Sequence, residues 1–145
     1  MDLAQYRFAH PIALRFSDVD ALQHVNNAKF ITYMETARMA YFREVIGWRG
    51  ALDELSVIIA RIECDYLLPV ELADAVTVHL RTSRLGNKSW DFEYAITKQT
   101  GSEPPQVAAR GLTVQVAFDY QQNASITIPD GWRAKMLTFE PALEG

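Results

Sequence analysis

The apolar residues of this chain repeat with two different periods, and this change of period constrains the fold more strongly than any other feature. Over residues 27–46 they recur every three or four positions, as residues on one side of a helix do. They share one broad face of that helix: Phe30, Ile31, Met34, Ala37, Tyr41, Phe42 and Val45. The narrow polar stripe opposite, and Gly47 at the position of a C-terminal cap, predict one long helix that is enclosed on most sides.

From residue 58 onward the period changes to two. Apolar and polar residues alternate in four segments, which are residues 58–66, 76–81, 90–96 and 112–118. Amphipathic segments with short connections predict an antiparallel sheet with one buried face. In the last segment we expect that face to carry Leu112, Val114, Val116 and Phe118. Turn residues at 85–88 predict a tight hairpin between the second and third of these strands.

Two weaker patterns complete the predicted fold. Residues 12–17 are interpreted as a short strand before the helix, and the chain after Pro129 as a short terminal helix. We find no linker or internal repeat, so residues 1–145 are expected to form a single domain. The fold class is α+β, with an antiparallel sheet around one central helix. One helix covers only part of such a sheet, so we expect its remaining apolar arc to contact a second subunit in a homodimer.

Composition excludes several classes of function. The formal net charge is −4 and no basic block is present, which argues against binding nucleic acid or an anionic membrane surface. No stretch approaches 18 apolar residues and the N-terminus lacks an apolar targeting segment, so the expected location is cytoplasmic. The one cysteine, Cys64, falls on the apolar side of its strand and is interpreted as a core residue, not a nucleophile.

A dense group of polar side chains precedes the helix. Asp18, Asp20 and His24 are followed by Asn26 and Asn27, one of which we expect to cap the helix. The first N–H groups of a helix are unpaired and carry partial positive charge, so they can stabilise an oxyanion on a carbonyl placed against them. A carboxylate on a loop folded back toward that end can attack the carbonyl or activate water. Asp20 fits this position, whereas Asp18 is interpreted as a turn former.

These residues resemble the signature of hotdog-fold acyl-CoA thioesterases, closest to the 4-hydroxybenzoyl-CoA thioesterase-like branch. The signature stretches are Arg15-Phe16-Ser17-Asp18-Val19-Asp20, His24-Val25-Asn26-Asn27-Ala28-Lys29-Phe30 and Glu35-Thr36-Ala37-Arg38. The resemblance continues through residues 66–70, Asp74 and residues 86–89. It implies the hotdog fold and hydrolysis of an acyl-CoA thioester to a carboxylic acid and coenzyme A. It also implies no separate cofactor, because coenzyme A is part of the substrate. We expect the homodimer to assemble into a tetramer, a choice between dimer and tetramer that the sequence leaves open.

The resemblance assigns roles to individual residues. Asp20 matches the catalytic carboxylate, as nucleophile or as general base. Asn27 and the N–H groups that follow it, with Ala28 in the substrate-binding set, match the helix start that polarises the thioester carbonyl. His24 matches a histidine of plant acyl-ACP thioesterases, but Leu22 stands where those enzymes have asparagine. The role of His24 is therefore open between structural hydrogen bonding and catalysis.

Two further groups are candidates. Glu35 and Arg38 are three residues apart within the apolar arc, so we expect an ion pair at a subunit contact. Glu35 is also the second candidate catalytic base, because some hotdog thioesterases use a helix carboxylate. The predicted hairpin resembles the family's ligand-side loop, and its polar residues are the remaining candidates for substrate binding: Arg84, Lys88 and Ser89.

Other readings of the same residues remain open. A hotdog enoyl-thioester hydratase or dehydratase has an Asp-x-Asn-Pro-x-His pattern, whereas His24 follows Asp20 after four residues and Asn-Pro is absent. A non-catalytic module that binds acyl-CoA is a third possibility. We expect no metal site, because Asp18, Asp20 and His24 are joined by no further obvious ligand in the sequence.

Overall fold

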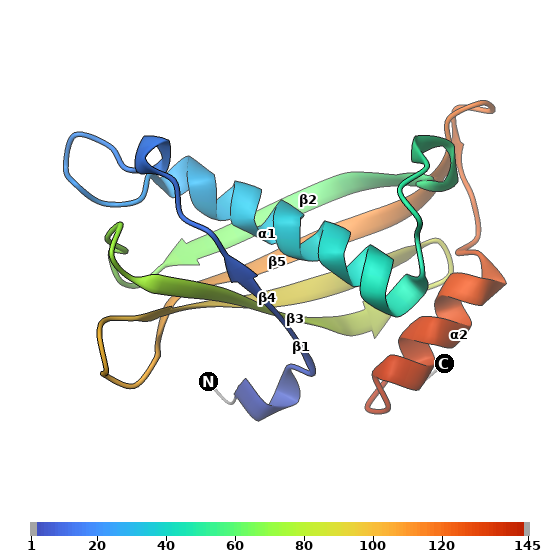
Figure 1. Ribbon diagram of the computed structural model, residues 1–145. Helices are drawn as coiled ribbons and strands as arrows, with labels where there is room; N and C mark the ends of the chain where they lie inside the picture. The colour runs from blue at the N-terminus through green and yellow to red at the C-terminus, as the bar shows by residue number, and fades with distance from the viewer. Residues whose placement is uncertain (1–2, 144–145) are drawn as a thin grey trace.

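A curved antiparallel sheet holds one long helix against its inner face in the computed structural model, which describes residues 3–143 (Figure 1). The strands are β1 (Phe8–Ile12), β2 (Val57–Tyr66), β3 (Ala75–Leu85), β4 (Ser89–Gln99), β5 (Gln106–Asp119) and β6 (Ala124–Ser125). The helices are α1 (Asn27–Tyr41), which continues as a π-helical turn (Phe42–Ile46), and α2 (Asp130–Phe139). The sheet order is β1-β3-β4-β5-β2, with β6 beside β5. No helix within residues 3–143 is long and apolar enough to cross a membrane.

The long helix forms as its sequence predicts. Asn26 caps its N-terminus, since the Asn26 side chain accepts a hydrogen bond from the Ala28 N–H. Gly47 ends it in the left-handed conformation, with φ 89°, which favours glycine. Met34 and Ala37 are completely buried against the sheet. The predicted helix 27–46 and its glycine cap are confirmed.

The Met34 side chain of α1 lies close to Gly111 of β5. A Cβ atom at this position would overlap the Sδ of Met34, and it would also lie 3.3 Å from the carbonyl oxygen of Glu63. A larger residue here would force the Met34 side chain to shift, because α1 lies close to β5 and not because of a special backbone angle.

The predicted orientation of β5 is wrong. Its face toward α1 carries Thr113, Gln115 and Ala117, all completely buried, whereas Leu112 and its apolar alternates lie on the outer face. The polar side chains are tolerated because they bond each other: Tyr94 pairs with Thr113 at 2.6 Å, Thr113 donates to Gln115, and Gln115 donates to the Trp90 carbonyl at 3.1 Å. Alternation identifies two faces but not which of them turns inward.

The edges of the sheet also differ from expectation. The first strand is Phe8–Ile12, not 12–17, because these residues pair with Val76–Leu80 of β3. Pro11 lacks an N–H and is tolerated on an edge strand. At the other edge, β2 pairs with β5 only and is mostly exposed; Ile62 is 44% exposed. The single buried face predicted for β2 is therefore absent within one chain.

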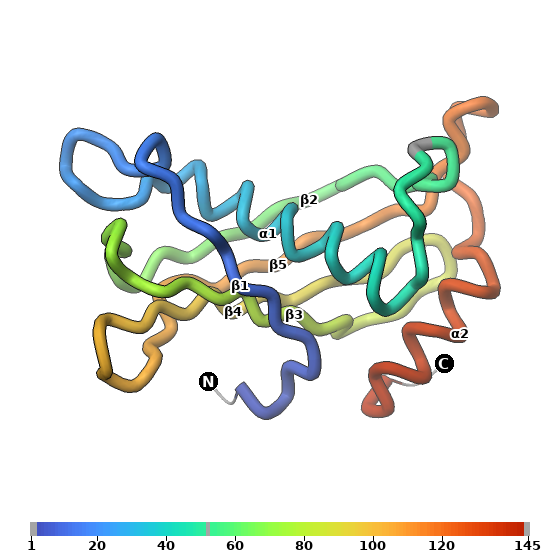
Figure 2. The backbone as a smooth tube through the Cα atoms, viewed as in Figure 1, coloured from blue at the N-terminus to red at the C-terminus, as the bar shows by residue number. Residues whose placement is uncertain are grey.

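The hairpin and the terminal helix are confirmed. β3 ends at Leu85 and β4 begins at Ser89, so the predicted turn connects them directly. α2 begins directly after Pro129 and packs beside the π-helical turn. Figure 2 shows the consequence: the loop before α1 lies at one end of the molecule, and the β3–β4 hairpin with α2 lies at the other.

Candidate active site

The loop that carries Asp20 is a small hairpin-like turn. Val19 and Val25 form an isolated antiparallel bridge, and the Asp20 N–H donates to the His24 carbonyl at 3.0 Å. Gln23 completes the turn with φ 65° and donates its N–H to the Asp20 carbonyl at 2.9 Å. The Asp20 carboxylate is thus held at the beginning of a tight, hydrogen-bonded turn.

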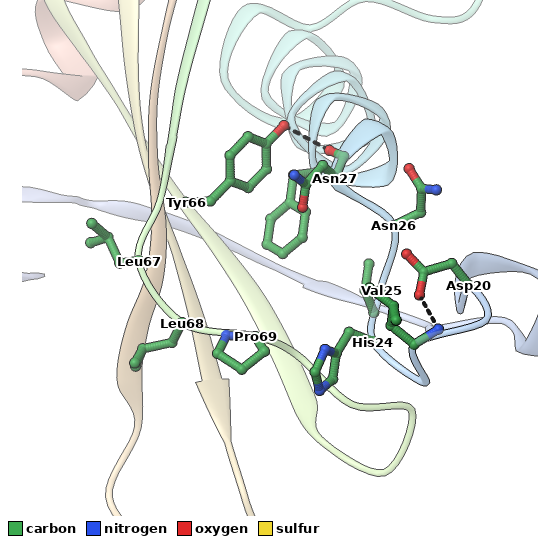
Figure 3. Close-up of a pocket in the computed structure, with 11 residues that line it drawn as sticks. Asp20, His24, Val25, Asn26, Asn27, Tyr66, Leu67, Leu68 and Pro69 are labelled. Carbon is green, nitrogen blue, oxygen red and sulfur yellow. Dashed lines mark hydrogen bonds between the residues drawn. The ribbon is translucent and has the colours of Figure 1, made fainter.

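One oxygen of the Asp20 carboxylate is engaged and the other is open. Oδ1 accepts the Leu22 N–H at 2.9 Å, as the dashed line in Figure 3 shows. Oδ2 accepts no hydrogen bond from any residue between 3 and 143. This arrangement orients the carboxylate and leaves one oxygen for chemistry.

The start of α1 lies beside this turn. The Ala28 N–H is engaged by the Asn26 side chain at 2.9 Å, and the Lys29 N–H by the Asn26 carbonyl at 2.9 Å. The Asn27 N–H has no acceptor in the described part of the chain. Because it sits at the positive end of the helix, Asn27 is the open donor of the site. Ala28 is exposed at the same end, but its N–H is already bonded to the cap.

Both groups open onto one pocket of about 570 Å³ between this loop, the start of α1 and the segment after β2 (Figure 3). Its polar lining comes from the loop and the helix start: Asp20, His24, Asn26 and Asn27. Its remaining lining is apolar: Leu22, Val25, Phe30, Tyr66, Leu67, Leu68 and Pro69. Asp20, His24 and Asn27, which the sequence singled out, therefore line a single pocket.

A second aspartate anchors the loop. Asp18 is buried, and its carboxylate accepts the Tyr33 hydroxyl at 2.7 Å and the Arg15 N–H at 3.1 Å. Burial alone would raise the pKa of Asp18, but these hydrogen bonds hold it below its usual value. The Asp18 carbonyl accepts the Asn26 N–H at 2.8 Å, so one residue joins both ends of the loop. The prediction that Asp18 shapes the turn is confirmed.

Comparison with known proteins identifies the family of this chain. A family model for the thioesterase-like superfamily matches residues 14–136. The chain belongs to the thioesterase-like superfamily. A thioesterase from Thermus thermophilus, complexed with coenzyme A and Zn, is 34% identical, covers 97% of this chain and 98% of that one, and has a TM-score of 0.83. That match confirms the hotdog fold.

Two more distant relatives agree. A predicted thioesterase from Bacillus stearothermophilus is 26% identical, covers 91% of this chain and 95% of that one, and has a TM-score of 0.82. The long-chain acyl-CoA thioesterase FadM of Escherichia coli K12 is 26% identical over 86% of this chain and 93% of FadM. The chain is a thioester hydrolase, which decides against the hydratase and the non-catalytic module.

The hairpin candidates of this thioesterase lie far from Asp20 within one chain. The Arg84 guanidinium donates to Ser89 at 2.9 Å and to Asp91 at 2.8 Å, and Lys88 is exposed. Arg133 of α2 binds the carbonyl of Gly86 at 2.6 Å, and α2 packs at the C-terminal end of the long helix. A helix over residues 27–46 is about 30 Å long. One chain therefore does not bring the hairpin and Asp20 together.

The pair of Glu35 and Arg38 on α1 agrees with the prediction only in part. Arg38 is buried and contacts Glu35 at 3.9 Å and the Tyr94 hydroxyl at 3.4 Å, so the predicted ion pair is confirmed. The Glu35 side chain is 66% exposed and does not line the Asp20 pocket. The helical wheel placed Glu35 in the apolar arc, but this part of the arc has no sheet above it in one chain.

Two other titratable candidates, Asp18 and Cys64, do not line the Asp20 pocket. Within residues 3–143 no three His, Cys, Asp or Glu side chains lie close enough to hold a metal ion, and Asp18 is turned toward Tyr33. Burial raises the pKa of the Cys64 thiol, which disfavours the thiolate that a nucleophile needs.

Sequence reasoning missed the wall opposite Asp20. Tyr66 donates its hydroxyl to the Asn27 carbonyl at 2.8 Å, and its ring packs edge-on against Phe30 at 5.2 Å. Leu67 and Leu68 follow directly. The available signal was a run of apolar residues before Pro69 that breaks the alternation of the strand, but only the fold places that run beside the helix start.

Proposed function

We propose that this thioesterase hydrolyses acyl-CoA thioesters to a free carboxylic acid and coenzyme A. The observation that carries the proposal is the shared pocket of an open Asp20 carboxylate oxygen and the open Asn27 N–H. The names of two relatives support coenzyme A as the carrier, since one is complexed with coenzyme A and the other is an acyl-CoA thioesterase.

The reaction follows from these two groups. The thioester carbonyl oxygen accepts the Asn27 N–H at the positive helix end, which stabilises the negative charge that develops on it. Asp20 either attacks the carbonyl carbon or removes a proton from the water that attacks it. The tetrahedral intermediate collapses, the C–S bond breaks, and the coenzyme A thiolate takes up a proton. If Asp20 attacks, water then hydrolyses the acyl-aspartyl anhydride.

His24 lines the same pocket and makes no side-chain hydrogen bond to any other residue in the described part of the chain. A histidine side chain there is suited to act as the general acid that protonates the departing thiolate. This role is secondary to those of Asp20 and Asn27, because the carbonyl can be polarised and attacked without it. A His24→Gln variant separates the two possibilities: a catalytic role lowers kcat and alters its pH profile, and a structural role changes stability.

We further propose that the active unit is a homodimer, which pairs into a tetramer, in the cytoplasm. Three features support the dimer. The apolar edge at Ile62 is exposed, Glu35 faces outward, and the hairpin with Arg84 and Lys88 lies too far from Asp20 to serve it. A second subunit would bury the edge and bring its own hairpin cations to the coenzyme A phosphates.

The test is release of free thiol from a panel of acyl-CoAs by wild type, Asp20→Asn and Asp53→Asn. Asp53 is exposed and outside the pocket, so it controls for a change of charge. We expect Asp20→Asn to lose at least 100-fold in kcat, on the order of what a general base contributes, and Asp53→Asn to match wild type. Full activity in Asp20→Asn would overturn the assigned role.

A further inference from the structure

Exposed apolar side chains gather at the mouth of the Asp20 pocket. Among the side chains that the structure describes, the exposed large hydrophobic ones are Phe16, Leu22, Ile62, Tyr66, Leu67, Leu68, Leu72 and Tyr120, and four of these line this pocket. Leu22 is 76% exposed and Leu67 is 49% exposed. A cluster of this kind beside a reactive carboxylate marks a surface that a ligand covers.

Leu67 and Leu68 form the leucine wall of the pocket. Their backbone is held in place by hydrogen bonds, and their side chains are exposed. The N–H groups of Leu67 and Leu68 both donate to the Ala108 carbonyl, at 2.8 and 3.1 Å. Tyr66 turns its hydroxyl to the Asn27 carbonyl, so its polar atom is engaged away from the wall. Figure 3 shows Leu67 and Leu68 along the segment that leaves Tyr66, across the pocket from Asp20. A ligand on this side of the pocket therefore contacts the apolar side chains of Leu67 and Leu68.

The charges in the pocket also favour an apolar ligand. No lysine or arginine is among the described residues that line it, and Asp20 is its one carboxylate. A carboxylate at the far end of an acyl group would find no lysine or arginine here and would be repelled by Asp20. A distal hydroxyl would lose water without gaining a partner on the leucine wall.

We propose that the pocket takes acyl groups that are hydrocarbon chains, and that Leu67 and Leu68 set the dependence of turnover on chain length. The proposal rests on the acyl-CoA hydrolysis proposed above, because it places the thioester carbonyl between Asp20 and the Asn27 N–H. The chain then runs along the leucine wall. Each methylene that is fully buried there contributes about a fourfold gain in kcat/KM, and a half-covered methylene about twofold.

The experiment measures kcat/KM by thiol release for saturated acyl-CoAs from acetyl to decanoyl, at concentrations below micelle formation. We expect a rise of at least about tenfold from butyryl to octanoyl. Adipoyl-CoA, which ends in a carboxylate, is compared with hexanoyl-CoA of the same length and is expected to be at least about tenfold poorer.

Matched variants test the leucines. Leu67→Ser and Leu68→Ser are expected to lose more with octanoyl-CoA, about tenfold, than with butyryl-CoA, about twofold. Leu72→Ser is the control, because Leu72 is 41% exposed in the same segment but does not line the pocket, and it should match wild type at every length.

The outcomes separate this inference from the proposed function. Thiol release from no acyl-CoA would overturn the proposed function and this inference with it. Thiol release that is flat with chain length, equal rates for adipoyl and hexanoyl, or equal losses in Leu72→Ser and Leu67→Ser would overturn the inference and leave acyl-CoA hydrolysis standing.

Discussion

The Tyr33 hydroxyl donates a 2.7 Å hydrogen bond to the buried carboxylate of Asp18, and this bond fastens the loop that carries Asp20 to the second turn of α1. The same carboxylate oxygen accepts the Arg15 N–H, and the Asp18 carbonyl accepts the Asn26 N–H. Asp20 is two residues beyond Asp18 and Asn27 is one beyond Asn26. The positions of Asp20 and Asn27 relative to each other therefore depend on this anchor.

Removal of the anchoring hydroxyl should loosen the loop. Tyr33→Phe deletes a bond to a charged, buried group, so we expect the free energy of unfolding to fall by about 2 kcal/mol in urea denaturation. We expect kcat to fall more than KM rises, because the loop positions Asp20. Tyr120→Phe is the control, since it removes a 2.7 Å hydroxyl bond to the Val57 carbonyl at an exposed position. Equal effects in the two variants would contradict the anchor.

The Asp18 carboxylate should make stability depend on pH in the acid range. Its pKa in the folded protein lies below the usual value of 3.8, so its stabilising contribution is present above that value and is lost as the pH falls through the folded pKa. Asp18→Asn should be less stable than wild type at pH 7, and the gap should close below about pH 4. Urea titrations at several pH values measure the gap; an unchanged gap at low pH would contradict this linkage.

The helix cap at Asn26 offers a way to separate stability from catalysis. Asn26→Ala should cost about 1 kcal/mol of unfolding free energy, because the Ala28 N–H loses its partner. Asn26→Asp should keep the cap and the stability, but its negative charge lies beside the Asn27 N–H and opposes the oxyanion. We expect Asn26→Asp to lower kcat at unchanged stability. Unaltered kcat in Asn26→Asp would argue against the helix start as the oxyanion site.

Because of the close contact between Gly111 and Met34, we expect larger residues at position 111 to destabilise the fold. Gly111→Ala is expected to destabilise the fold by about 1–3 kcal/mol, because the new methyl overlaps the Met34 sulfur. Gly131→Ala is the matched control, since a Cβ there meets nothing within 4 Å and the helix gains from alanine. A double variant with Met34→Ala should lose less than the sum of the single changes.

Much of the fold follows from periodicity because periodicity reports how each segment meets its surroundings. The helix over 27–46 and the strands β2 to β5 were predictable, since burial of one side leaves a repeat in the chain. The inward face of β5 was not, because Thr113 and Gln115 are stabilised by partners on another strand. Nor was β1, where Pro11 obscures the pattern and pairing with β3 decides the strand.

The residues of the candidate site were likewise predictable only in part. Asp20 and Asn27 were identifiable as pocket residues because they are close in the chain, at a fixed spacing before a capped helix. Leu67 and Leu68 became part of the site only when β2 and β5 carried them beside the start of α1. Local sequence specifies turns, caps and periods, which depend on neighbouring residues. The position of Leu67 and Leu68 in the pocket depends on contacts between segments far apart in the chain, and so does the distance of Arg84 from the pocket. A short sequence pattern contains no information on the free energy of such contacts.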